Sequence, residues 1–225
     1  MQKFNFKGAL FDLDGTLADN YSAIHLCTCA AFRKFGVPEP SLEKIVSTVG
    51  GSILITMKRL LAGSQYESLY EKIADLYLEL YPNFVFCGLK AMPFAEETLS
   101  AVRASGVKIA CFTNKQTEGA EQVLGFLGLD KYLDCVVSTT LHSPRKPDKD
   151  FTEFALKKIG LPASAVVGIG DSPFDYQAAR VCSVASALVC TGGDSKQSLV
   201  QKCPEAIGVF DNLKDLATAI FSVDL

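Results

Sequence analysis

From about residue 94 onward, short apolar runs alternate with amphipathic stretches, and this alternation restricts the fold more than any other feature. The amphipathic stretches have apolar residues at helical spacing, whereas the runs between them show no polar face. Strands of this kind, separated by helices, form parallel sheets that helices cover on both faces. The runs that predict strands are residues 6–11, 107–112, 134–139, 165–170 and 186–190. The sequence therefore predicts an α/β fold, a Rossmann-like parallel sheet with helices on both faces.

Residues 18–89 depart from this rhythm, because their apolar residues recur only at helical spacing. The simplest architecture is a small all-helical domain inserted after the first strand. Gly88 and Pro93 provide backbone breaks where the chain would return to the sheet. We therefore expect two domains, an α/β core of residues 1–17 and 90–225 and a helical domain of residues 18–89.

Composition excludes several classes of function. Of the 225 residues, 48% are hydrophobic and 21% are charged, with a net charge of -3. Such a chain can bury a substantial core but lacks the basic footprint of a nucleic-acid-binding protein. No apolar stretch reaches the roughly 20 residues of a membrane-spanning helix. The 8 cysteines without a secretory signal indicate a cytoplasmic protein, and the sequence leaves monomer and homodimer open.

The most informative motif, DLDGTL at residues 12–17, follows the first predicted strand. Its two carboxylates, Asp12 and Asp14, stand before a glycine turn. Ligands of open α/β sheets bind at the carboxyl ends of the strands, which is where this motif places both acids. An isolated D-x-D pair is more often a helix cap or a solvated turn, but the longer motif in this position favours a functional pair.

Polar groups also follow the next two predicted strands. Thr113 and Asn114 could donate hydrogen bonds to phosphate oxygens, together with the N–H groups that open the next helix. Lys146 precedes Pro147, which fixes the backbone, so its ammonium group could be held in place. Taken singly, the first pair is typical of a helix cap and the lysine of a solvated loop.

Two acids, Asp171 and Asp175, follow the fourth predicted strand, and Pro173 between them suits the first turn of a helix. Acids at a helix start are favoured by the helix dipole even without a ligand. That explanation fits Asp175 better than Asp171, which comes directly after the tight sequence Gly168-Ile169-Gly170. Asp171 is therefore the stronger candidate for a functional carboxylate, of the type that metal ions bind.

Taken together, the four motifs provide the groups that phosphoryl transfer requires: a nucleophile, a proton donor, a cation and oxygen ligands for a hard metal ion. They resemble the four ordered motifs of the haloacid dehalogenase superfamily of phosphohydrolases, and the resemblance covers nearly the whole chain. The helical domain matches the family's cap domain. Within the superfamily the pattern is most similar to phosphoglycolate phosphatase-like members, with support from residues 17–20 and 49–51.

The resemblance implies a role for each motif. Asp12 would attack phosphorus and carry an aspartyl-phosphate, while Asp14 would protonate the leaving alkoxide and later help to activate water. Thr113 and the backbone of Asn114 would bind the phosphoryl oxygens. Lys146 would stabilise the negative charge on the nucleophile and on the phosphate.

The resemblance also implies a Mg²⁺ ion held by Asp12, the backbone carbonyl of Asp14 and Asp171, with Asp175 in support. A cation is physically reasonable, because carboxylates that gather around a phosphate repel it unless their charge is offset. The expected function is a magnesium-dependent phosphatase for a small phosphorylated metabolite, with phosphoglycolate as the best candidate. Open alternatives are a phosphosugar mutase of the β-phosphoglucomutase type, a pyrophosphatase or a nucleotidase, and a non-catalytic binding protein.

Four further residues bear on the substrate. Lys58 and Arg59 could reach a substrate carboxylate, although a solvated helix face is the default interpretation. His142 is expected to be an ordinary loop histidine, with a substrate contact as the alternative. Asn20 stands where many relatives of the resembled family have serine, and we expect it to affect docking of the cap rather than the catalytic set.

Overall fold

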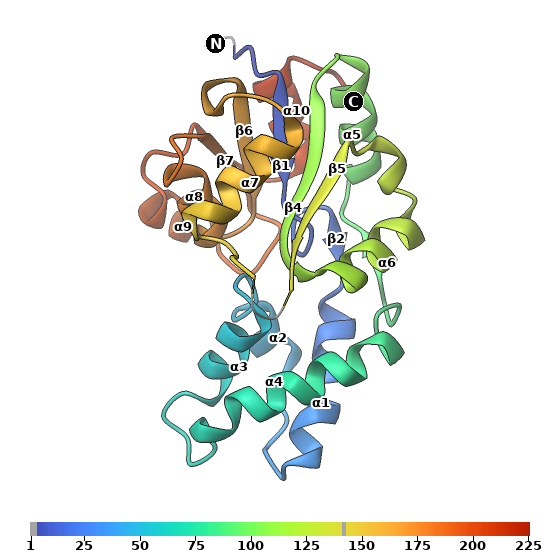
Figure 1. Ribbon diagram of the computed structural model, residues 1–225, viewed down its shortest axis with the longest axis vertical. Coiled ribbons are helices and arrows are strands. Elements are labelled where there is room, and N and C mark those ends of the chain that lie inside the picture. Colours follow the sequence, from blue (N-terminus) through green and yellow to red (C-terminus); the bar gives the residue numbers. More distant parts are fainter. Residues whose placement is uncertain (1–3, 141–142) are drawn as a thin grey trace.

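The computed structural model describes residues 4–140 and 143–225. At its centre is a six-stranded sheet in the order β5-β4-β1-β6-β7-β8, in which all neighbouring strands are parallel (Figure 1). The strands are β1 (Gly8–Phe11), β4 (Lys108–Gln116), β5 (Cys135–Thr139), β6 (Val166–Gly170), β7 (Ala185–Val189) and β8 (Gly208–Phe210). The predicted parallel sheet is confirmed, and the predicted strands correspond to β1, β4, β5, β6 and β7. The edge strand β8 was not predicted.

Helices cover both faces of the sheet. Successive side chains of a strand point to opposite faces. The helices of this part are α5 (Ala95–Ala104), α6 (Thr117–Leu127), α7 (Lys149–Ile159), α8 (Pro173–Arg180), α9 (Lys196–Lys202) and α10 (Leu213–Phe221). Because of the alternation along β1, Phe11 packs in the cluster that contains α5, α6 and α10, whereas Leu10 packs in the cluster that contains α7 and α8.

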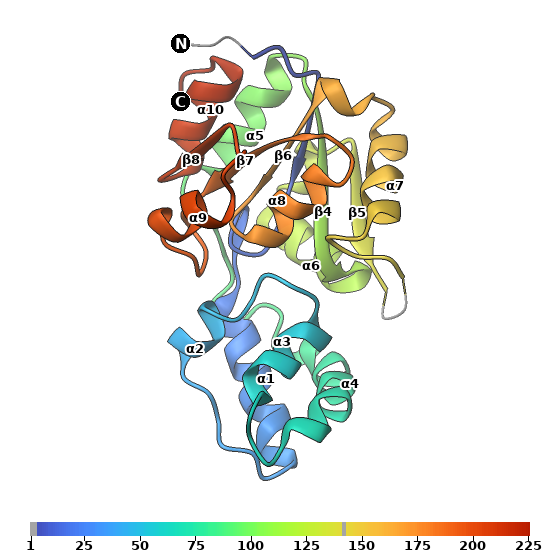
Figure 2. The same ribbon diagram turned by 90° about the vertical axis from the view of Figure 1, so that its left-hand side faces the viewer.

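Residues 18–89, called the helical insertion below, are joined to the α/β part at one place, where the chain both leaves it and returns to it. Its two connections lie side by side because β2 (Ala18–Asp19) pairs antiparallel with β3 (Lys90–Ala91). Figure 2 shows the insertion beyond the carboxyl ends of the sheet strands. Its main helices are α1 (Tyr21–Lys34), α2 (Leu42–Val46), α3 (Ile53–Leu61) and α4 (Tyr70–Leu80).

Glycines allow the helical insertion to approach the α/β part closely. A Cβ atom on Gly193, in the loop after β7, would lie 2.2 Å from the carbonyl oxygen of Val46. On the insertion side, a Cβ on Gly50 would lie 3.3 Å from Cβ of Ser172, and one on Gly51 would lie 3.2 Å from the ring of Phe174. The backbones therefore meet where a larger residue would hold them apart.

None of the helices formed by the described residues is both long and apolar enough to cross a lipid bilayer.

Candidate active site

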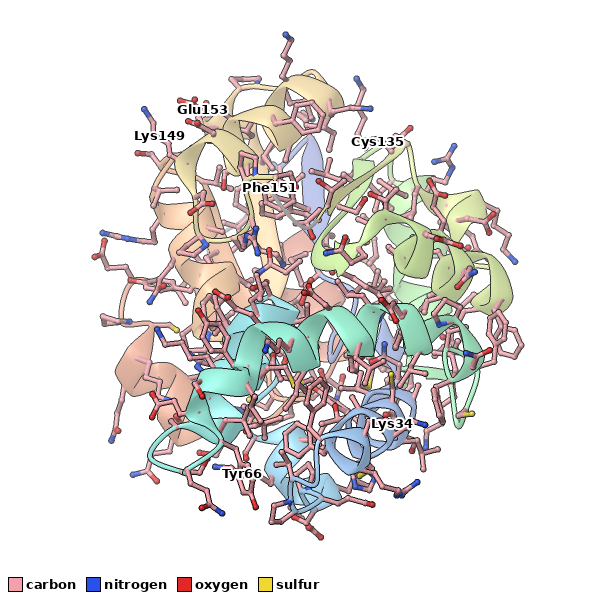
Figure 3. The ribbon with its side chains drawn as sticks, turned by 60° about the horizontal axis from the view of Figure 1, so that its bottom comes forward. Lys34, Tyr66, Cys135, Lys149, Phe151 and Glu153 are labelled. Carbon is pink, nitrogen blue, oxygen red and sulfur yellow. The ribbon has the colours of Figure 1, made fainter. Side chains whose placement is uncertain are left out.

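The loops at the carboxyl ends of β1, β4, β5 and β6 converge on the edge of the sheet that faces the helical insertion. Asp12 directly follows β1 and Asp171 directly follows β6, as the sequence predicted. Thr113 and Asn114 lie within β4 rather than after it, because this strand continues through an irregular stretch before it ends at Gln116. Seen from the insertion, α4 crosses in front of this edge (Figure 3).

Three carboxylates meet at the centre of the site. Asp12, Asp171 and Asp175 each offer one oxygen within 4.8 Å of the others, and each residue is at most 7% exposed. Carboxylates that are buried together repel one another unless a proton or a cation offsets their charge. Oxygen ligands suit a hard divalent cation, so this cluster could hold a metal ion.

Lys146 provides a fixed positive charge beside this cluster. Its Nζ donates to Oδ1 of Asp12 at 2.8 Å and to Oδ1 of Asp175 at 2.6 Å, and its side chain is 2% exposed. Asn114 holds the lysine backbone, since its side chain accepts from N of Lys146 at 2.7 Å and donates to the carbonyl oxygen at 3.2 Å. Burial alone would lower the pKa of Lys146, but the attraction of Asp12 and Asp175 outweighs it and raises the pKa. The ammonium group therefore stays charged at neutral pH.

Without a cation, burial and mutual repulsion favour the protonated form of the carboxyl groups in this cluster. Burial raises the pKa of Asp12 from 3.8 to about 7; Lys146 opposes this effect, and the negative charge of Asp175 adds to it. Burial and then the charges of Asp175 and Asp12 raise the pKa of Asp171 well above its ordinary value. A divalent cation would replace these protons and restore the carboxylate form.

Two glycines make room for the Asp171 carboxylate. A Cβ on Gly15 would lie 2.6 Å from its Oδ2, and a Cβ on Gly192 would lie 1.7 Å from the same atom. Oδ1 accepts a hydrogen bond from the hydroxyl of Thr16 at 3.2 Å. The carboxylate is thus held between two backbone segments, with little freedom to move.

Asp175 is fixed by the start of α8. Its Oδ2 accepts from the backbone N of Ser172 at 3.1 Å and from the Ser172 hydroxyl at 2.6 Å. Ser172 and Asp175 thus form a capping box, and Pro173 lies in the first turn of the helix. The predicted helix-start interpretation of Asp175 therefore applies. Its other oxygen contacts Lys146, so the same residue also belongs to the acidic cluster.

Asp14 lies beside this cluster, with different partners. Its Oδ1 accepts from Nδ2 of Asn20 at 2.8 Å, and its Oδ2 accepts from Nζ of Lys115 at 3.2 Å. Nδ2 of Asn20 also donates to the hydroxyl of Tyr81, on the helical insertion, at 3.3 Å. Asn20 thus links the helical insertion to Asp14, which fits the expected effect on docking, but the expectation that it does not touch the candidate catalytic residues was wrong.

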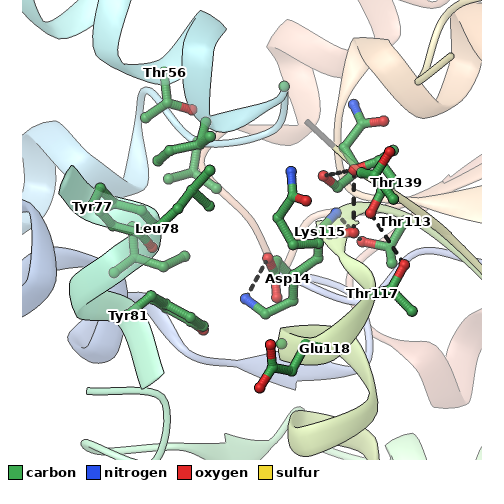
Figure 4. A pocket seen from close by; sticks show the side chains of 18 of the residues that line it. Asp14, Thr56, Tyr77, Leu78, Tyr81, Thr113, Lys115, Thr117, Glu118 and Thr139 are labelled. Carbon is green, nitrogen blue, oxygen red and sulfur yellow. Dashed lines mark hydrogen bonds and ion pairs between the residues drawn. The ribbon is translucent and has the colours of Figure 1, made fainter. Parts of the chain in front are cut away.

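A cavity of about 370 Å³ opens between this edge of the sheet and the helical insertion. Figure 4 shows Asp14, Lys115 and Thr113 on one side and Thr56, Tyr77 and Tyr81 of the insertion on the other. Several lining residues, including Ile24, Ile53 and Leu78, are apolar. Both Asp12 and Asp14 line the cavity, so a ligand inside it would reach both carboxylates.

Lys58 and Arg59, for which contact with a substrate carboxylate was the alternative to a solvated helix face, do not line this cavity. Lys58 lies over the ring of Tyr70, and Arg59 lies over the ring of Phe174. His142 lies outside the described residues. Lys115 was not assigned a role from the sequence, although it shares a strand face with Thr113 if the strand continues beyond residue 112.

A parallel α/β fold with an acidic cluster at the carboxyl edge, a buried lysine against it and an adjoining cavity defines a class of enzymes that act on phosphate esters. Residues 9–189 match the family model described as haloacid dehalogenase-like hydrolase. This chain belongs to that family. Its superfamily assignment and its nature as a phosphatase-type hydrolase are thus confirmed.

The chain is also similar to two named phosphatases and to a hydrolase of known structure. The chain is 27% identical over 212 residues to phosphoglycolate phosphatase 1 of Pseudomonas aeruginosa. This match covers 92% of this chain and 77% of that protein. The chain is 32% identical over 178 residues to the phosphoglycolate phosphatase of Nitrosospira multiformis, covering 77% and 78%. The crystal structure of a hydrolase from Pseudomonas syringae superposes with a TM-score of 0.79 at 26% identity, covering 97% of this chain and 100% of the other.

Proposed function

We propose that the chain is a Mg²⁺-dependent phosphatase that hydrolyses a small phosphate monoester through an aspartyl-phosphate on Asp12. The observation that carries this proposal is the position of the Asp12 carboxylate. It lines the cavity, accepts a hydrogen bond from Lys146 and belongs to the cluster with Asp171 and Asp175. A nucleophile needs this combination of access to the substrate and fixed positive charge nearby.

Other residues would act on the phosphoryl group and on the leaving group. Thr113 lines the same cavity as Asp12, and its hydroxyl could donate to a phosphoryl oxygen there. Lys146 would hold the attacking carboxylate in position, because its contact with Asp12 is buried and short. Asp14 would give a proton to the leaving oxygen and take one from the water that hydrolyses the intermediate.

The metal site would use Asp12, Asp171 and the backbone carbonyl of Asp14, with Asp175 in support. The three buried carboxylates each offer an oxygen atom as a ligand, and Mg²⁺ prefers oxygen ligands. When bound, Mg²⁺ would neutralise charge on the phosphoryl oxygens and on the carboxylates. Asp171 is held by Thr16 and by the close backbone at Gly15 and Gly192, so the site is built before a cation arrives.

We propose further that residues 18–89 act as a cap domain on a core of residues 1–17 and 90–225. The paired connections β2 and β3 support this division, since they give the helical insertion one narrow attachment. A cap that closes over the cavity would exclude water from the leaving group. The 8 unpaired cysteines support a reducing, cytoplasmic location.

Phosphoglycolate is the proposed substrate. Support comes from the names of the relatives and from the position of a cation, Lys115, beside Asp14. The test is a screen of phosphorylated metabolites with Mg²⁺, including phosphoglycolate, a hexose phosphate, a nucleotide and pyrophosphate. We expect the highest kcat/KM for phosphoglycolate. A nucleotide, pyrophosphate or hexose phosphate at the top of the ranking would overturn this substrate while leaving the chemistry of Asp12 open.

The chemistry is tested by Asp12→Asn, in which an amide of the same size is a far poorer nucleophile. We expect kcat to fall at least ~10³-fold on every ester of the screen. Circular dichroism and the melting temperature serve as the folding control. A folded Asp12→Asn variant with near-normal turnover would show that another group attacks phosphorus.

A further inference from the structure

Lys115 is the one positively charged side chain among the described residues that line the cavity. It lies near the end of β4, two residues after Thr113, and both residues line the cavity. The other charged residues on the described wall are the acids Asp12, Asp14 and Glu118. Among the described side chains of this wall, only the ammonium group of Lys115 would therefore attract an anionic group of the substrate by its charge.

The ammonium group of Lys115 is held at this position from two sides. Nζ lies 3.2 Å from Oδ2 of Asp14 and 4.6 Å from the centre of the Tyr81 ring, and the side chain is 7% exposed. Gly119 leaves room for the lysine, because a Cβ there would lie 3.5 Å from Cε of Lys115 and 3.3 Å from the ring of Tyr81. Packing from both parts of the molecule thus aims this charge at one point of the cavity.

The ammonium group retains capacity for a ligand. It has three N–H donors, of which Asp14 engages one and the face of Tyr81 another. The remaining donor is available to an acceptor that enters the cavity. Lys115 is therefore positioned to bind a substrate group as well as to contact Asp14.

The distance from Lys115 to Asp14 sets the kind of substrate group that would fit. On the proposed function, Asp14 protonates the leaving oxygen, so that oxygen lies within hydrogen-bond distance of its carboxylate. A group that binds Nζ at the same time must lie close to the leaving oxygen, since Nζ is 3.2 Å from Oδ2. A carboxylate on the carbon that bears the ester oxygen meets this condition, because three covalent bonds separate its oxygens from the leaving oxygen.

We propose that Lys115 is the specificity-determining residue of this site and binds the carboxylate of a phosphate ester whose acid group is attached to the ester-bearing carbon. This inference rests on the proposed function and assigns to β4 a role that the sequence had offered to Lys58 and Arg59. Esters with an uncharged group in that place lose the contact. Esters with a longer spacer carry the carboxylate away from Nζ.

The test compares two esters of similar size, phosphoglycolate and 2-hydroxyethyl phosphate, in which a hydroxymethyl group replaces the carboxylate. The quantity measured is the ratio of their kcat/KM values, determined in one enzyme preparation so that the active fraction cancels. We expect the wild-type enzyme to prefer phosphoglycolate, and Lys115→Met and Lys115→Gln to lower the ratio about 10- to 100-fold, the range for a hydrogen bond to a charged group. A fall in activity that is equal for both esters would instead indicate a role through Asp14 alone and would overturn the proposal.

The matched control is Lys58→Met, which removes an exposed lysine of the helical insertion that does not line the cavity. This variant should keep the wild-type ratio. An unchanged ratio in both Lys115 variants, or a wild-type preference for 2-hydroxyethyl phosphate, would refute the role of Lys115 while phosphate-ester hydrolysis stands. Failure of the proposed function would look different, since turnover of both esters would then survive Asp12→Asn.

Discussion

Asp12 combines two properties that oppose each other in an isolated side chain. Burial favours its protonated form, and the pKa rises to about 7 for this reason, whereas a nucleophile must be ionised. Lys146, 2.8 Å away, favours the ionised form, as would a cation bound between the carboxylates. The positive charges near Asp12 therefore determine how much of its carboxyl group is ionised and able to attack.

At the same scale, Gly192 should control metal affinity. A Cβ there would lie 1.7 Å from Oδ2 of Asp171, so Gly192→Ala must displace this carboxylate. We expect the Mg²⁺ concentration for half-maximal activity to rise at least ~10-fold, as for residues that orient metal ligands. The control is Gly125→Ala on α6, where a Cβ meets nothing within 4 Å. Equal Mg²⁺ requirements in the two variants would show that Asp171 is not a ligand.

The sequence predicted that Asp12, Asp171 and Thr113 lie at one edge of the sheet, because the two acids directly follow parallel strands and Thr113 lies near the end of another. It did not predict the contacts of Asn20 and Lys115 with Asp14. Asn20 precedes α1 and reaches Asp14 only because the chain turns back at Gly15, with φ of 87°. Contacts that depend on such turns cannot be read from spacing alone.

At the scale of elements, the contact between the loop after β7 and the end of α2 determines how closely the helical insertion approaches. Gly193→Ala would bring a Cβ to 2.2 Å from the carbonyl oxygen of Val46. Because that atom belongs to backbone, the insertion must move away. We expect kcat/KM to fall about tenfold, in line with the cost of misplacing catalytic groups, with the Mg²⁺ requirement unchanged.

Comparison with Gly125→Ala again separates this effect from a general effect of alanine. A Gly193→Ala variant with wild-type kcat/KM would mean that close approach of the insertion at this point is not needed for turnover. A raised Mg²⁺ requirement would mean instead that the substitution acts through the neighbouring Gly192.

Elements with strong periodicity were predicted well. The strands from β1 to β7 of the sheet and the helices of the insertion follow from apolar runs and helical spacing. β8, with 3 partly exposed residues, is too short to give a periodic signal. The apolar run predicts that the strand ends at residue 112, whereas β4 continues to Gln116. The last residues of β4 are polar and their register shifts against β5, so they show no apolar pattern.

At the scale of the whole molecule, the buried acids couple stability to pH and to metal. Without a cation, the folded chain binds protons on Asp12 and Asp171 more tightly than the unfolded chain does. The contribution of Asp12 to stability is therefore fully present below about pH 4 and is lost as the pH rises through about 7, and the raised pKa of Asp171 acts in the same direction. A Mg²⁺ ion bound between these carboxylates would replace the protons, so its stabilising effect should grow over the same pH range.

The expected result is a rise in melting temperature with saturating Mg²⁺ of about 5 °C at pH 8, and a much smaller rise at pH 5. Differential scanning calorimetry with and without EDTA measures both values. Asp171→Asn should remove most of the increment at pH 8. An increment that is the same at pH 5 and pH 8 would show that Mg²⁺ does not compete with protons at this cluster.

The stereochemical course at phosphorus shows whether a phosphoryl group is carried covalently on Asp12. The substrate is a phosphorothioate ester made chiral with two oxygen isotopes and hydrolysed in water of the third, so that the released thiophosphate carries sulfur and three different oxygens and its configuration can be determined. Each in-line displacement inverts phosphorus, so attack by Asp12 followed by attack of water predicts overall retention. Overall inversion would mean that water attacks the ester directly, and it would contradict the account.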